Sequence, residues 1–227
     1  MLENLKKRVY MQNIALVKHN LVVLTWGNAS ARDLETGLIV IKPSGVPYST
    51  MKEGDMVVVD IEGNVVEGNY KPSSDLPTHL YLYKQYPSVN GIVHTHSTYA
   101  TAYAQAGKEI IAYGTTHADG FYGNIPCTRS LTKEEIEGSY EWNTGKIIVE
   151  AVKDVESIPS ILVKNHGVFT WGSTVEKAVE VAVTLEEVAK MAFLTESINA
   201  KTNKLDQNLL DKHYFRKHGK NAYYGQK

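Results

Sequence analysis

The distribution of apolar residues predicts a helix and then a group of strands in the first third of the chain. Apolar side chains at positions 2, 5, 9, 14, 16 and 17 form an imperfect helical stripe from Leu2 to about His19. Apolar and β-branched runs then predict extended segments at Leu21–Trp26, Leu38–Ile41 and Met56–Val59. The residues Glu-Gly-Asn at 62–64 predict a hairpin turn after the last of these runs.

Helices and strands alternate through the rest of the chain. Four helices are predicted from their first residues, and they are expected to begin near Pro77, at Ser97, at Thr132 and at Ser173. Two strands, Ile161–Val163 and Val168–Trp171, are expected to meet at the Asn-His-Gly sequence of residues 165–167. Clustered strands with hairpin turns favour an α/β fold in which helices cover a mainly antiparallel sheet.

The composition limits the kinds of partner and the cellular compartment that we expect. The chain has 227 residues and no linker, so we expect a single domain over residues 1–227. With 24 Lys and Arg against 25 Asp and Glu, the net charge of −1 gives no reason to expect nucleic acid or a membrane surface as partner. The single cysteine, the lack of a signal peptide and the lack of a run of about 20 apolar residues predict a cytoplasmic protein.

His94 and His96 are the strongest candidates for chemistry. They follow an apolar Ile-Val pair that is typical of a buried strand, and strand residues two apart project from the same face. Such a pair either binds a metal ion or forms ordinary hydrogen bonds. Asp75 and His166, at a helix start and after an apolar run, would complete a set of three imidazoles and one carboxylate. That set suits one divalent ion, zinc above all, with manganese or cobalt as alternatives.

Three polar segments are candidates for binding an anion. They are Gly27-Asn28, Lys42 with Ser44 and Gly45, and Ser73-Ser74. Glycine permits close approach of the backbone, hydroxyls and N–H groups donate to phosphate oxygens, and lysine adds positive charge. Each segment alone is more often an ordinary turn, but Ser73-Ser74 directly precedes a candidate metal ligand. Together the segments predict a phosphorylated substrate close to the metal.

A set of short motifs, weak singly and specific in their joint order, runs along the whole chain. They are TWGN at 25–28, IKPSG at 41–45, KPSSD at 71–75, VHTHS at 93–97, TTHAD at 115–119, NHG at 165–167, and LDKHYFRKHG at 210–219 with YYGQ at 223–226. In this combination the chain resembles the class II aldolase/adducin family, and within it the sugar-phosphate epimerases. The resemblance implies a three-layer α/β/α fold with a central, mainly antiparallel sheet.

The resemblance also implies roles for individual residues. The metal ligands would be Asp75, His94, His96 and His166. Substrate would contact Gly27, Asn28, Lys42, Ser44, Gly45, Ser73, Ser74, Thr115, His213 and Arg216. Asp119 and Tyr224 would form an acid/base pair. The implied assembly is a homotetramer with active sites at subunit interfaces, to which the C-terminal helix and tail of a neighbouring subunit contribute.

The activity implied is the inversion of C4 in a phosphorylated ketopentose, from L-ribulose 5-phosphate to D-xylulose 5-phosphate. This carbon carries no acidic hydrogen, so a retro-aldol cleavage and re-addition is required, with a divalent ion as Lewis acid and two acid/base groups on opposite faces. The implied context is pentose catabolism, with L-arabinose degradation as the expected route and L-ascorbate degradation as the alternative.

Two alternatives remain open at this stage. A class II aldolase would release its triose product, but related aldolases carry glutamate where this chain has Asp75. An adducin-like scaffold would use the fold for interaction alone, and would have no need of four metal ligands. Of the other conspicuous residues, His79 is expected on a helix surface and Trp26 in internal packing.

Overall fold

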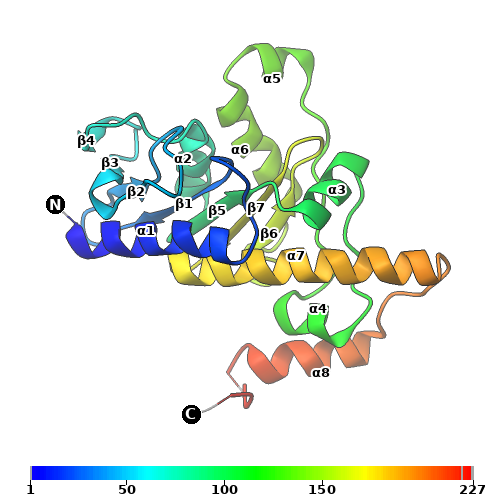
Figure 1. Ribbon diagram of the computed structural model, residues 1–227. Coiled ribbons are helices and arrows are strands. Elements are labelled where there is room, and N and C mark those ends of the chain that lie inside the picture. The colour runs from blue at the N-terminus through cyan, green and yellow to red at the C-terminus, as the bar shows by residue number, and fades with distance from the viewer. Residues whose placement is uncertain (1, 221, 226–227) are drawn as a thin grey trace.

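A seven-stranded sheet forms the centre of the molecule (Figure 1). This computed structural model describes residues 2–220 and 222–225, and the strand order is β4-β3-β2-β1-β5-β7-β6. The strands are β1 (Asn28–Arg32), β2 (Ile39–Ile41), β3 (Val57–Val59), β4 (Val65–Glu67), β5 (Gly91–Thr95), β6 (Ser160–Leu162) and β7 (Val168–Gly172). All neighbouring strands pair antiparallel. The predicted α/β fold with a mainly antiparallel sheet is therefore confirmed.

Helices cover both faces of this sheet (Figure 1). They are α1 (Glu3–Lys18), the short 3₁₀ helix η1 (Glu53–Asp55), α2 (Leu76–Gln85), α3 (Thr98–Ala106), α4 (Thr115–Gly120), α5 (Lys133–Glu137), α6 (Tyr140–Ala151), α7 (Val175–Ile198) and α8 (Gln207–Lys217). Within the described part of the chain, no helix is both long enough and apolar enough to span a bilayer.

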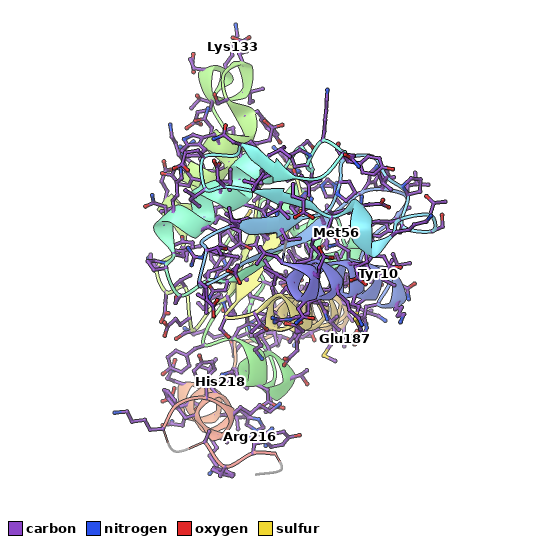
Figure 2. The ribbon with its side chains drawn as sticks, turned by 90° about the vertical axis from the view of Figure 1, so that its left-hand side faces the viewer. Tyr10, Met56, Lys133, Glu187, Arg216 and His218 are labelled. Carbon is purple, nitrogen blue, oxygen red and sulfur yellow. The ribbon has the colours of Figure 1, made fainter. Side chains whose placement is uncertain are left out.

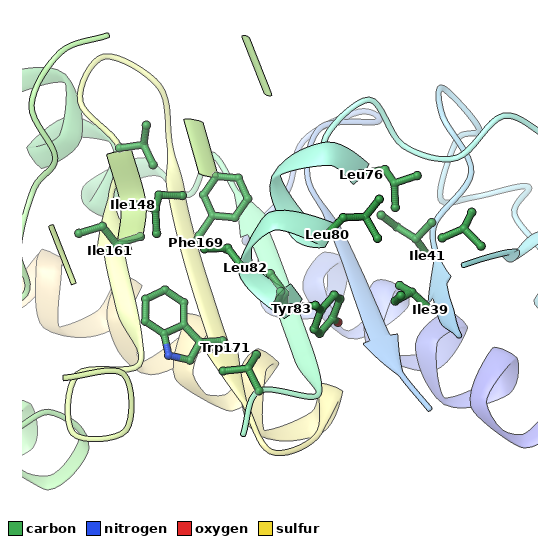
Figure 3. Packing of buried hydrophobic residues seen from close by; sticks show 14 of the residues in the cluster. Ile39, Ile41, Leu76, Leu80, Leu82, Tyr83, Ile148, Ile161, Phe169 and Trp171 are labelled. Atoms are coloured by element: carbon green, nitrogen blue, oxygen red, sulfur yellow. The ribbon is translucent and has the colours of Figure 1, made fainter. Parts of the chain in front are cut away.

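The alternation of side chains along the strands divides the core into two layers. Ile39 and Ile41 of β2 pack with residues of α2 and α6 on one face, as Figure 3 shows for Leu80 and Tyr83 of α2. Val40, between them in sequence, packs with residues of α1 and α7 on the other face. Because strand side chains alternate with a period of two, even-numbered residues of β1 and β5 point toward α2. His94 is therefore on the α2 side of the sheet.

Helices α4 and α8 lie outside this arrangement. They pack on each other, and α4 also packs on α7. Figure 1 shows both of them beyond α7, away from the sheet. Helix α7 thereby lies between the sheet and these two helices (Figure 1).

The segment Leu21–Trp26 was expected to be extended, and that prediction is wrong. Asn20, Leu24 and Gly27 have positive φ values of 56°, 55° and 80°, which turn the chain tightly and prevent a strand. The first strand begins at Asn28 instead.

The other local differences concern helices. Helix α7 is capped by Thr174, whose hydroxyl accepts from the N–H of Lys177, and not by the predicted Ser173. Helix α6 was not predicted, and neither was α4, the helix that contains Asp119.

Candidate functional site

Three histidines meet at one end of strands β5 and β7. His94 lies in β5, His96 follows that strand, and His166 lies in the turn between β6 and β7. The pairing of Thr95 with Val168 brings these segments together. The Nε2 atoms of His94 and His96 are 3.1 Å apart, and ligand nitrogens of all three rings lie within 4.8 Å of one another. The structure thus gathers three of the four predicted metal ligands.

The nitrogens of this histidine cluster fit a divalent cation. The Nδ1–H of His94 donates to the carbonyl of Val168 at 3.0 Å, which leaves Nε2 as the ring nitrogen that could bind an ion. The Nδ1 of His166 is buried and has no hydrogen-bond partner among the described residues. Burial and the neighbouring imidazoles lower the pKa of His166 to about 3 and also lower the pKa of His96. Converging neutral imidazoles are the donors that zinc and similar ions prefer.

Asp75 lies at the start of α2, next to the histidine cluster. Its carboxylate accepts a hydrogen bond of 2.7 Å from the side-chain amide of Asn28. Burial opposes ionisation, but the nearby His94, His79 and His166 lower the pKa of Asp75 overall. Asp75 is not among the residues whose ligand atoms lie within 4.8 Å of one another, so its role as a fourth ligand stays a prediction.

The two loops predicted to bind phosphate lie side by side. The N–H of Ser44 donates to the carbonyl of Lys71, and the N–H of Ser73 donates to the carbonyl of Lys42, both at 2.9 Å. The side chain of Asn28 also donates to the hydroxyl of Ser73 at 3.0 Å. Asn28 therefore joins these loops to Asp75 and, through its pairing with His94 in the sheet, to the histidine cluster.

Gly27 supports this junction from the preceding turn. Its φ of 80° favours glycine. A Cβ at this position would lie 2.8 Å from the carbonyl oxygen of His94. The close approach of the two backbones therefore depends on the missing side chain.

Lys42 has a different place from the one its charge suggested. Its side chain is buried, and its ammonium donates to the carbonyls of Pro43 and Val46 at 3.2 and 3.0 Å. It also lies over the ring of Tyr48 at 4.8 Å, and burial lowers the pKa of its ammonium. Lys42 thus shapes the loop that contains Ser44 and Gly45, and direct contact with substrate stays a prediction.

Asp119 forms a charged cluster with α8. Arg216 donates to both carboxylate oxygens, at 3.0 and 2.8 Å, while His213 and Lys217 lie 3.0 and 3.2 Å away. The Nε2 of His218 donates to the backbone carbonyl of Asp119 at 2.9 Å. Although burial opposes it, these donors lower the pKa of Asp119 and hold the group as a carboxylate. Figure 2 shows Arg216 of α8 and His218, which follows that helix, at the opposite end of the molecule from Lys133.

Tyr224 lies beside the same cluster. Its ring is 4.9 Å from the guanidinium carbon of Arg216 and 4.4 Å from the ammonium of Lys217. Asp119 and Tyr224 both line a cavity of about 710 Å³. The structure therefore brings the predicted acid/base pair together. Thr115 is half-buried at the first position of α4, the helix that carries Asp119.

The histidine cluster and the predicted acid/base pair lie at opposite ends of the β5–β7 pair. The histidines lie at the end where Thr95 pairs with Val168. The cavity of Asp119 and Tyr224 is lined by Val89 and Gly172, at the end where Gly91 pairs with Gly172. A strand of five residues at about 3.4 Å per residue separates these ends by roughly 15 Å. One chain alone does not place both groups around one substrate.

Two aromatic residues near the histidines were not expected there. Trp26 is 55% exposed, so the prediction that it packs internally is wrong, and its ring lies 6.5 Å from that of His96. Tyr140 lies 6.0 Å from His166, and it belongs to the helix α6 that the sequence did not predict. The position of Trp26 next to Gly27-Asn28 was the one available signal, since that motif borders the site.

His79 was also misplaced by the sequence. It is fully buried, and the prediction of a surface position is wrong. Burial lowers the pKa of this histidine to about 3, against the opposing charge of Asp75.

The comparisons with known proteins agree with this geometry. A family model described as Class II Aldolase and Adducin N-terminal domain matches residues 8–193. Proteins described as L-ribulose-5-phosphate 4-epimerase UlaF, from Salmonella paratyphi C (strain RKS4594) and Salmonella choleraesuis (strain SC-B67), are each 58% identical over 228 residues, covering 100% of both chains. The match to these relatives therefore includes α8 and the tail, which lie beyond the family model.

Solved structures have the same fold. An L-fuculose 1-phosphate aldolase superposes with a TM-score of 0.78 at 27% identity, over 92% of this chain and 94% of the other. YgbL from Escherichia coli, described as a putative aldolase/epimerase/decarboxylase, superposes with a TM-score of 0.75 at 20% identity, over 92% and 97% of the two chains.

Proposed function

Since this chain belongs to the class II aldolase and adducin family, we propose that it is a metal-dependent epimerase that interconverts L-ribulose 5-phosphate and D-xylulose 5-phosphate. The observation that carries the proposal is the junction at Asn28. This residue links the two hydroxyl-rich loops to Asp75, beside the histidine cluster. A divalent ion beside loops that bind phosphate would suit a retro-aldol reaction of a sugar phosphate, because the ion would stabilise the enediolate that cleavage leaves.

The reaction follows from the chemistry of C4. This carbon bears a hydroxyl and has no carbonyl neighbour, so its hydrogen is not acidic, and inversion requires cleavage of the C3–C4 bond. A bound divalent ion, held by His94, His96, His166 and Asp75, supplies Lewis acidity toward the substrate oxygens. The ion we propose is zinc, with manganese and cobalt as alternatives.

The loops would hold the phosphate while the bond is broken. The hydroxyls of Ser44 and Ser74 and the N–H of Gly45 would donate to phosphate oxygens. Lys42 supports this role because its ammonium fixes the loop from inside. A fixed phosphate keeps the two-carbon fragment, glycolaldehyde phosphate, in the site while its aldehyde group rotates to present the opposite face.

Asp119 and Tyr224 would act on opposite faces of C4. One of them takes the proton from the C4 hydroxyl as C3–C4 breaks. After re-addition to the other face of the aldehyde, the second group returns a proton to the C4 oxygen. The substrate gains and loses one proton, and the two groups re-equilibrate through solvent. The lowered pKa of Asp119 favours the proton-accepting state of that group.

A second copy of the chain would complete the site. We propose a homotetramer in which α4, α8 and the tail of one subunit bring Asp119, His213, Arg216 and Tyr224 to the histidine cluster of its neighbour. The separation of the two groups within one chain supports this arrangement. We further propose a cytoplasmic role in pentose catabolism, through L-arabinose degradation or, alternatively, L-ascorbate degradation.

The acid/base assignment is tested by the products of Asp119→Asn. Loss of one acid/base partner should slow epimerisation by about 10²-fold or more. Cleavage from the face served by Tyr224 should continue, so free dihydroxyacetone and glycolaldehyde phosphate should accumulate. Asp211→Asn, which changes a carboxylate of α8 that binds the hydroxyl of Tyr122, should epimerise normally. Epimerisation by Asp119→Asn at the unmodified rate would contradict the two-face mechanism.

The tyrosine assignment has an internal control. Tyr223 and Tyr224 are adjacent and similarly exposed, at 58% and 60%. Tyr224→Phe should reduce turnover by about 10²-fold or more, and Tyr223→Phe should leave it nearly unchanged. The opposite pattern would assign the role to Tyr223.

A further inference from the structure

Strand β1 and helix α2 are joined by a buried row of polar side chains. Asn28 and Ser30 are fully buried on the α2 side of β1. They meet Asp75, His79 and Tyr83, which follow one another at intervals of four along α2. Two residues of strand span about 6.8 Å and four residues of helix about 6 Å, so the two rows stay in register. Polar groups buried in such number require a reason beyond packing.

His79 is the central member of this row. Its Nδ1 lies 2.7 Å from the hydroxyl of Ser30, and that hydroxyl lies 2.8 Å from the hydroxyl of Tyr83. Figure 3 shows Tyr83 between α2 and the sheet, in the apolar core.

The direction of these hydrogen bonds is determined by counting protons. If Tyr83 donates to Ser30 and Ser30 donates to His79, both hydroxyl protons have an acceptor. The reverse direction would leave the proton of Tyr83 unbonded in the core, at a cost of about 1–3 kcal/mol. His79 therefore accepts at Nδ1, and the neutral ring carries its proton at Nε2.

The remaining ring proton, on Nε2, is not used within the row of polar side chains. It has no hydrogen-bond partner among the described side chains, although His79 is fully buried. The charge that acts most strongly on this ring is that of Asp75, one helical turn earlier. The ring also packs edge-on against Phe169 at 5.8 Å, and Phe169 stacks on His94 at 4.3 Å. His79 is thus connected to Asp75 through the charge of that carboxylate, and to His94 through the ring of Phe169.

We propose that His79 is a positioning residue of the metal centre, held as the Nε2–H tautomer by the Tyr83–Ser30–His79 relay so that its remaining N–H steadies the Asp75 carboxylate. This inference rests on the proposed metal site, and it adds a group that does not itself bind the ion. Loss of a hydrogen bond to a side chain that binds the metal typically lowers metal affinity by about 10–100-fold.

A matched pair of substitutions distinguishes the roles of the two ring nitrogens of His79. The amide nitrogen of glutamine overlies Nε2 of histidine, and that of asparagine overlies Nδ1. His79→Gln keeps the donor and should bind zinc within about threefold of the unmodified protein. His79→Asn should bind zinc about 10–100-fold more weakly. Affinity is measured on the full-length protein by competition with a colorimetric zinc chelator, and folding by circular dichroism. Equal loss in both variants, or loss in neither, would overturn the proposal.

The tautomer itself is observable without substitution of His79. Two-dimensional ¹H–¹⁵N NMR of the ¹⁵N-histidine-labelled, metal-free protein should show His79 with its proton at Nε2. Tyr83→Phe should weaken this preference and lower zinc affinity, whereas Tyr81→Phe, on the same helix, should change neither. A proton at Nδ1 in the unmodified protein would overturn the relay. No substrate is needed, so a protein that passes these tests but does not epimerise would reject the proposed reaction alone.

Discussion

The turn that carries His166 depends on the absence of a side chain at Gly167. A Cβ at this position would lie 2.7 Å from the carbonyl oxygen of Thr95 and 2.9 Å from Cδ2 of His96. Both distances are shorter than real side chains tolerate. Gly167 therefore allows His166 to approach the other two histidines. The histidine cluster thus requires glycine after His166.

Replacing His96 by Asn should reduce zinc affinity and turnover together. The change removes one converging nitrogen from the cluster, while the half-exposed position leaves the core intact. We expect a loss of zinc affinity of about 10-fold or more in a folded protein, measured by chelator competition and circular dichroism. His19→Asn, at the exposed end of α1, should bind zinc normally. Full zinc content in His96→Asn would remove His96 from the ligand set.

Acid should destabilise the protein through its buried neutral histidines. Burial lowers the pKa of His117 to about 4 from the ordinary 6.5. Below pH 6.5 the unfolded chain binds a proton that the folded chain does not, so stability falls as pH decreases toward 4, by up to about 1.4 kcal/mol per pH unit. Above pH 6.5 this group has no effect.

His117→Gln should flatten that dependence. Glutamine keeps a donor for the carbonyl of Gly123, which His117 contacts at 2.7 Å, and it does not titrate. Urea unfolding at several pH values measures the slope, and His19→Gln serves as the exposed control. An unchanged slope in His117→Gln would contradict the assignment.

The histidine pair was predictable because alternation along a strand is a local rule. His94 and His96 needed only the strand pattern, and His166 needed only a turn after an apolar run. His79 was not predictable in this way, since α2 carries apolar residues around much of its circumference. Its burial depends on the polar face of β1, which no property of α2 alone reveals.

At the scale of elements, the N-terminus of α3 is capped by a carboxylate of α7. Glu186 of α7 accepts hydrogen bonds from the backbone N–H groups of Tyr99 and Ala100, at 2.8 and 3.0 Å. The cap residue Ser97 makes no side-chain capping bond. Glu186 therefore caps α3 from another helix, immediately after the segment that carries His96.

Glu186→Gln should lower the free energy of unfolding by about 1 kcal/mol. Glutamine loses the charge that interacts with the helix dipole, and its amide group presents a donor to one of the two N–H groups. The neighbouring residue Glu187, exposed on α7 (Figure 2), supplies the control variant Glu187→Gln. Denaturant unfolding should distinguish the two variants, and equal stabilities would show that the carboxylate does not cap α3.

Element prediction succeeded where caps and alternation were explicit. The helices expected to begin at Thr132 and Ser97 have these residues as their N-caps. The strand prediction for Leu21–Trp26 was wrong, because a run of apolar residues gives no sign of positive φ values. Element prediction also failed at α6, whose Gly145 is a poor helix former that lets Tyr81 of α2 approach closely.

At the scale of the whole molecule, the positions of α4 and α8 decide how the site is assembled. Local sequence patterns predict both the metal motif and the tail motif, but they do not place one relative to the other. The structure puts them at opposite ends of the β5–β7 pair. That separation is the main physical argument for a site shared between two copies.

Two inactive variants should therefore restore each other. His96→Asn and Asp119→Asn damage opposite halves of a shared site. If subunits of each are unfolded together and refolded at a 1:1 ratio, about a quarter of the interfaces should combine two intact halves. Activity should rise from near zero toward a quarter of the unmodified value. A mixture no more active than its components would place each complete site within one chain.

The central claim is that the enzyme inverts C4 and retains both fragments. The most direct measurement is incubation of the purified, zinc-loaded protein with L-ribulose 5-phosphate, followed by ¹³C NMR of the products. We expect an equilibrium mixture with D-xylulose 5-phosphate, little free glycolaldehyde phosphate, and no reaction after the metal is removed by chelation. Release of dihydroxyacetone and glycolaldehyde phosphate as the main products, or full activity without metal, would contradict the central claim.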